Sequence, residues 1–152
     1  MSGAALKLKT STVDLEVSLQ GRDRLQLQMN LVNGTIESAK LSGSGCSDFL
    51  NLLQAWRPKL TGSLETLELP QGDSHSSLLL REAILRAQGE WKFPYADEEI
   101  CHCRAVSTAK VDAAIIGGCR SVRAIARETS AGTSCGSCRT DTEAIINYRL
   151  KS

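Results

Sequence analysis

Along the first forty residues, apolar side chains recur at every second position. The alternating positions are Val13, Leu15, Val17 and Leu19, followed by Leu25, Leu27, Met29 and Leu31. An Asn33–Gly34 pair, which favours a tight hairpin turn, precedes a third run that starts at Ile36. Period-two alternation is typical of strands with one buried face, so this segment predicts a three-stranded antiparallel sheet.

After Cys46 the apolar period becomes helical. Phe49, Leu50, Leu53 and Trp56 share one helix face, and Pro58 marks the end of that helix. The stretch TGSLETLELP predicts a turn and a short helical piece, and residues 75–91 predict a second helix. Helices that cover one face of an antiparallel sheet form an α+β domain, which we assign to residues 8–92.

A linker is predicted at residues 93–99, which contain Pro94 and a short acidic run. Residues 100–152 then predict a small all-helical domain. Ser107 and Ser121 are candidate helix N-caps, and a third helix starts near Cys138. Three short helices bury little apolar surface, and a bound metal is a common source of the missing stability.

Composition narrows the class of protein. Of 152 residues, 41% are hydrophobic and 23% charged, which indicates a folded globular chain. The sequence contains neither an apolar run long enough for a membrane span nor a signal-peptide pattern, so we expect a cytoplasmic protein with no membrane partner. Aromatic residues make up only 4%, and no basic, aromatic-rich stretch suggests binding to nucleic acid. In the cytoplasm, six cysteines indicate metal or redox chemistry rather than disulfides.

Four of these cysteines form two close pairs. They are Cys101-x-Cys103 and, after a long interval, Cys135-x-x-Cys138. Each pair precedes a predicted helix, whose N-terminal N–H groups and dipole favour thiolates. The spacing fits either zinc or a [2Fe–2S] cluster and does not choose between them. Cys119 matches no ligand position, and His102 alternates with two cysteines, so we expect it to point into solvent.

The stretch ICHCRAVSTAKVDAAIIGGCRSVRAIARETSAGTSCGSC resembles the bacterioferritin-associated-ferredoxin (BFD) type of [2Fe–2S] domain, which also occurs in NifU proteins. The resemblance implies a small helical array with a cluster near one end. It also implies that the ligands are Cys101, Cys103, Cys135 and Cys138. It therefore favours a [2Fe–2S] cluster over zinc.

The first domain resembles the NifU/IscU cluster-assembly scaffold in the stretches LQLQMNLVNGTIESAKLSGSGCSDFL and LELPQGDSHSSLLLREAILRA. The resemblance implies a second metal site for zinc or iron, with Asp23, Cys46 and His75 as candidate ligands. Gly21 and Ser76 stand where that scaffold has its other two cysteines. Because neither residue replaces a thiolate well, a degenerate scaffold is favoured over a working assembly site.

Together these features predict a non-enzymatic, two-domain NifU-like protein that holds one [2Fe–2S] cluster. The resemblance implies a role in iron–sulfur cluster assembly or in associated electron transfer. Expected partners are a cysteine desulfurase or other iron–sulfur assembly and redox proteins. Two alternatives remain: a ferredoxin-like electron carrier whose first domain only docks partners, and a zinc-stabilised adaptor with no redox role.

Overall fold

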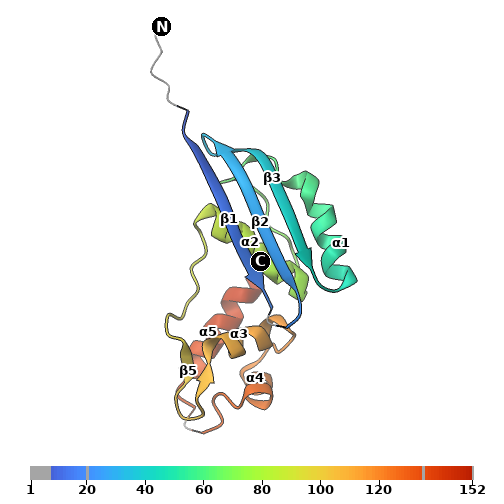
Figure 1. The fold of residues 1–152 in the computed structure, drawn as a ribbon. Helices are drawn as coiled ribbons and strands as arrows, with labels where there is room; N and C mark the ends of the chain where they lie inside the picture. Colours follow the sequence, from blue (N-terminus) through green and yellow to red (C-terminus); the bar gives the residue numbers. More distant parts are fainter. Residues whose placement is uncertain (1–7, 20, 135, 152) are drawn as a thin grey trace. The chain divides into compact units, whose positions relative to one another are not determined.

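The computed structural model describes residues 8–19, 21–134 and 136–151. The chain divides into two compact units, and the ribbon in Figure 1 follows their elements. The first unit comprises Met1–Pro70 and Leu80–Trp91, and the second comprises Gln71–Leu79 and Lys92–Ser152. None of the helices within the described ranges is long and apolar enough to cross a membrane.

The first unit contains a four-stranded antiparallel sheet. Its strands are β1 (Thr10–Ser18), β2 (Arg24–Val32), β3 (Thr35–Ser44) and β4 (Gly62–Ser63), in that order. The three predicted strands are confirmed, and the hairpin residues Asn33 and Gly34 both have positive φ, 52° and 80°. The short helix predicted after Thr61 is absent. Instead, Gly62 adopts a left-handed conformation (φ 81°) and opens the two-residue strand β4, which pairs with the start of β3.

One face of this sheet is buried beneath helices. Leu25 and Leu27 of β2 are fully buried, as the alternation predicted. Helix α1 (Ser47–Trp56) buries Phe49 and Leu53, and a 3-10 turn, η1 (Arg57–Lys59), ends it at the proline. Helix α2 (His75–Gln88) lies behind the sheet in Figure 1, and its residue Ile84 is fully buried. These contacts confirm an α+β first unit.

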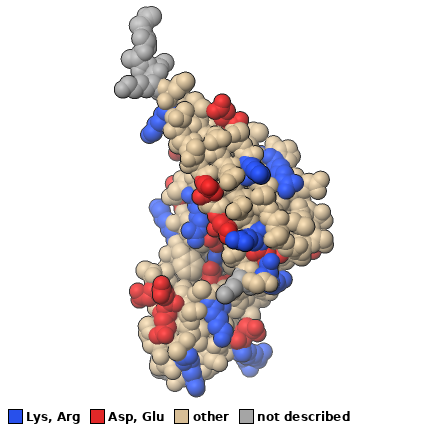
Figure 2. Space-filling model, viewed as in Figure 1, with Lys and Arg blue, Asp and Glu red and all other residues tan. Residues whose placement is uncertain are grey.

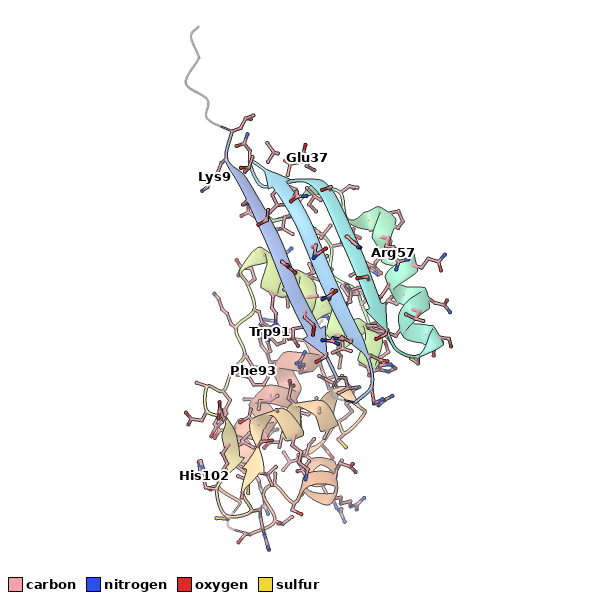
Figure 3. The ribbon with its side chains drawn as sticks, in the orientation of Figure 1. Lys9, Glu37, Arg57, Trp91, Phe93 and His102 are labelled. Carbon is pink, nitrogen blue, oxygen red and sulfur yellow. The ribbon has the colours of Figure 1, made fainter. Side chains whose placement is uncertain are left out.

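A β-bulge in β3 changes which residues face the core. Leu31 pairs with Ile36 while Asn30 pairs with Ser38, so Glu37 is the extra residue of the bulge. Ile36 and Leu41 are therefore both buried although they are an odd number of positions apart. Figure 3 labels Glu37 at that end of the sheet.

Among the described residues from Lys92 onward, the second unit contains three helices and a short hairpin. The elements are β5 (Glu99–Cys101), β6 (Val106–Ser107), α3 (Thr108–Ile116), α4 (Val122–Thr129) and α5 (Arg139–Leu150). The predicted caps are confirmed, because the Ser107 and Ser121 hydroxyls each accept a backbone N–H at 3.1 Å. The all-helical prediction is not confirmed, because the ends of the loop that carries the first cysteine pair join as an antiparallel hairpin.

The core of this unit is small and includes two cysteines. Its buried members are Ile100, Cys101, Val106, Val111, Ile115, Ile125, Ala131, Cys138, Ile145 and Ile146. Phe93 and Tyr95, from the segment predicted as a linker, pack against it. The Tyr95 hydroxyl donates to the Glu99 carbonyl at 2.9 Å. Partial burial raises the pKa of the Tyr95 phenol, and nearby negative charges add to the effect, so it stays a donor at neutral pH.

A bidentate ion pair joins two helices of the second unit. The Arg149 guanidinium on α5 donates to both carboxylate oxygens of Asp112 on α3, at 2.8 and 2.6 Å. The Arg149 side chain is only 4% exposed, and its guanidinium carbon lies 6.0 Å from the centre of the Phe93 ring. The pair therefore links α3, α5 and the segment that enters this unit.

Candidate metal centre

The first cysteine pair lies on the β5–β6 hairpin. Cys101 is the last residue of β5 and is 3% exposed, whereas Cys103, in the turn, is exposed. Ala105 takes a left-handed conformation (φ 53°), which allows the chain to return to β6. The hairpin therefore presents one thiol on the core side and one on the surface.

His102 lies between these two cysteines and points to solvent, as predicted. Its side chain is 69% exposed, and Nδ1 lies 2.7 Å from the Glu99 carboxylate. In Figure 3 the labelled His102 is on the outer side of the hairpin. The ring therefore contacts an acidic side chain at the surface.

The second cysteine pair precedes α5. Cys138 is the N-cap residue of α5 and is 4% exposed, and its carbonyl accepts the Thr142 N–H at 2.9 Å. Its thiol therefore lies beside the first turn of a helix, where unsatisfied N–H groups favour negative charge. Cys135, the fourth predicted ligand, lies outside the described residues, so the geometry of the complete set stays a prediction.

The loop before Cys138 is shaped by two glycines and an arginine. Gly132 and Gly136 have φ values of 79° and 74°, a conformation that glycine adopts without strain. Arg139 donates from Nε and Nη2 to the Gly132 carbonyl at 3.3 and 3.1 Å. A Cβ on Gly132 would lie 3.7 Å from both Arg139 Nε and Cys138 Sγ, so both side chains border this glycine. A positive charge there suits an anionic thiolate ligand.

The donors of this region fit an iron–sulfur cluster. Cysteine thiolates are the usual ligands of such clusters, and two of the candidate thiols are buried in the core. The Thr142 hydroxyl, one helical turn after Cys138, is also buried and has no hydrogen-bond partner within the described part of the chain. A buried unpaired hydroxyl costs about 1–3 kcal/mol, so a bound group with acceptor sulfurs would satisfy a donor that the protein leaves open.

Two of the three candidate ligands predicted for a second metal site lie together in the first unit. Asp23 and Cys46 belong to that unit, whereas His75 belongs to the second unit. Asp23 is 3% exposed, and its Oδ1 accepts the Cys46 N–H at 3.1 Å. His75 is the first residue of α2. Carboxylate, thiolate and imidazole groups can all bind zinc, and a metal site formed by these three residues stays a prediction.

The residues that match this scaffold's missing ligands provide no thiolate. Ser76, one of them, is 3% exposed, and its Oγ lies 3.4 Å from His75 Nε2. Gly21, the other, has a positive φ of 75° in the turn between β1 and β2. Neither residue therefore adds a thiolate to the predicted ligands.

Lysines, arginines and acidic residues are interspersed over the face shown in Figure 2. The sequence from residue 101 onward carries eight Lys and Arg against four Asp and Glu. On the visible face this excess does not form a continuous basic area.

Comparison with known proteins identifies a domain within the second unit. Residues 99–148 match the family described as "BFD-like [2Fe-2S] binding domain". The large subunit of nitrite reductase (NADH) from Escherichia coli (strain K12) is 34% identical over 119 residues. That alignment covers 78% of this chain but 13% of the relative, so the chain spans a small part of that protein. No solved structure matches.

The stretch aligned with the nitrite reductase subunit is longer than the matched domain, so it includes residues before Glu99. The resemblance of the first unit to the NifU/IscU scaffold is not part of these findings and stays a prediction. The predicted cofactor, in contrast, is confirmed. Residues 99–148 form a BFD-like [2Fe–2S] binding domain, and the cofactor of this chain is a [2Fe–2S] cluster.

Proposed function

We propose that this chain is a non-enzymatic electron-transfer protein that holds its cluster through Cys101, Cys103, Cys135 and Cys138. The observation that carries the proposal is the domain match, which spans all four cysteines. A [2Fe–2S] cluster, when bound, exchanges single electrons. The likeness to a subunit of a reductase supports a redox role over that of a zinc-stabilised adaptor.

The described residues have different roles at such a site. Cys101 and Cys138 hold it from the core side, where packed isoleucines exclude water. Cys103 is exposed, so one edge of the site lies near the surface that a redox partner can approach. Arg139, bound to the Gly132 carbonyl, fixes the loop that enters Cys138. The buried side limits the access of water to the site, and the exposed edge leaves a short path for electron exchange.

A redox titration of the full chain tests this proposal. We expect a reversible one-electron couple, with a paramagnetic signal that appears on chemical reduction and vanishes on reoxidation. A zinc protein would give no such signal at any potential. A cluster that is lost on every reduction cycle would also contradict a carrier role.

A second candidate function, iron–sulfur cluster assembly with a cysteine desulfurase, is favoured by the contact within the first unit between Asp23 Oδ1 and the Cys46 N–H, two of the predicted ligand residues beside His75. On this account the full chain binds a further zinc or iron ion besides its cluster. Cys46→Ala should lose that ion and keep the visible spectrum, because Cys46 is exposed and its side chain does not cap α1. Metal analysis of wild type and Cys46→Ala, with Cys119→Ala as the control, tests this second function. Equal metal content in Cys46→Ala and wild type would contradict this second role.

A further inference from the structure

The Thr142 hydroxyl takes no part in the hydrogen bonding of its own helix. A buried threonine in a helix commonly donates to the carbonyl four residues earlier. Thr129 does so in α4, where Oγ1 lies 2.7 Å from the Ile125 carbonyl oxygen. Thr142 is equally buried, at 2% exposure, yet its Oγ1 has no partner among the residues that the structure describes.

The position of this hydroxyl indicates what it could bind. Residues four apart share one face of a helix, and Cys138 and Thr142 are joined by the backbone bond between the Thr142 N–H and the Cys138 carbonyl. Both side chains are buried, and Ile145 and Ile146 continue the same core-facing side of α5. The unpaired donor is therefore buried, one helical turn from a residue predicted to be a cluster ligand.

We propose that Thr142 donates a hydrogen bond to the sulfur of the bound cluster, either the Cys138 thiolate or an adjacent inorganic sulfide, and thereby raises its reduction potential. Reduction adds negative charge to the sulfurs, and a hydrogen-bond donor stabilises that charge. On this account Thr142 is not a ligand of the cluster but changes its reduction potential through a hydrogen bond. The inference rests on the proposed role of Cys138 as a cluster ligand.

The test compares potentials of the full chain with its cluster bound. Thr142→Val keeps the shape of the side chain and removes the hydroxyl, whereas Thr142→Ser keeps the hydroxyl. We expect a more negative midpoint potential for the valine variant, a potential near that of wild type for the serine variant, and unchanged iron content in both. Thr140→Val, at an exposed position of α5, is the matched control and should leave the potential unchanged.

Each result of these measurements either supports or overturns the proposed role of Thr142. Equal potentials in wild type and Thr142→Val would overturn the inference and leave the proposed function intact. A wild-type chain without any cluster would overturn both. If Thr142→Val and Thr142→Ala lose the cluster while Thr142→Ser retains it, the hydroxyl is needed to hold the centre, which supports the inference. Loss in all three variants would indicate a packing role and overturn it.

Discussion

Replacing Cys138 with serine is expected to remove the cluster and to destabilise the second unit. Serine is a poor substitute for a soft thiolate, so iron and sulfide should fall to near zero. The Cys138 side chain is 4% exposed, and a hydroxyl buried in its place costs about 1–3 kcal/mol. Loss of the bound centre adds to this cost, because metal binding and folding are coupled in small metal domains. Iron and sulfide analysis and thermal unfolding followed by circular dichroism measure both effects.

Cys119→Ser is the matched control for this variant. Cys119 is partly buried and packs against the same core, but it matches no ligand position. It should keep the cluster and its visible spectrum, with at most a modest loss of stability. A Cys138→Ser protein that retains full iron and sulfide, or a Cys119→Ser protein that loses them, would show that the ligand assignment is wrong.

Replacing Asp112 with alanine should destabilise the second unit by about 3 kcal/mol. The change removes the bidentate acceptor of Arg149, whose side chain is 4% exposed, and so leaves a poorly compensated charge in the core. Removing one partner of a buried ion pair commonly costs about 3–5 kcal/mol. We expect the lower end of this range because the Asp112 side chain is 19% exposed. Denaturant unfolding of the cluster-bound chain, followed by helical circular dichroism, measures the change.

Two further variants test whether this loss of stability comes from the ion pair. Glu143→Ala removes an exposed carboxylate from α5 and should change the free energy of unfolding by less than about 0.5 kcal/mol. The double variant Asp112→Leu/Arg149→Met, which replaces the pair by apolar groups, should recover part of the stability. A loss below about 1 kcal/mol in Asp112→Ala would mean that the pair is not structurally important.

The regular parts of the fold could be predicted from the sequence because their signals are local. Alternation, the Asn33–Gly34 turn and the serine caps each act within a few residues, and the strands and helices they predicted are present. The bulge at Glu37 could not be predicted in the same way, because it depends on how β3 pairs with β2. The β5–β6 hairpin was missed for a similar reason, since a two-residue strand such as β6 carries no period to detect.

From the sequence we could predict only those residues of the candidate site whose role follows from their type and spacing. Spacing identified the cysteine pairs, and the domain match agrees with the cofactor that the resemblance implied. Thr142 carries no such signal, because only its burial and its unpaired hydroxyl distinguish it from an ordinary helix residue. The contact of Arg139 with Gly132 likewise depends on two left-handed glycines that bring the loop back to the helix.

The central claim, that this chain holds a [2Fe–2S] cluster, is tested most directly by iron, zinc and acid-labile sulfide analysis. The protein should be the full chain, purified without oxygen after expression with ample iron. We expect about two irons and two sulfides per chain, and a red-brown protein with absorption bands in the visible range. A colourless protein with about one zinc per chain and no sulfide would contradict the account.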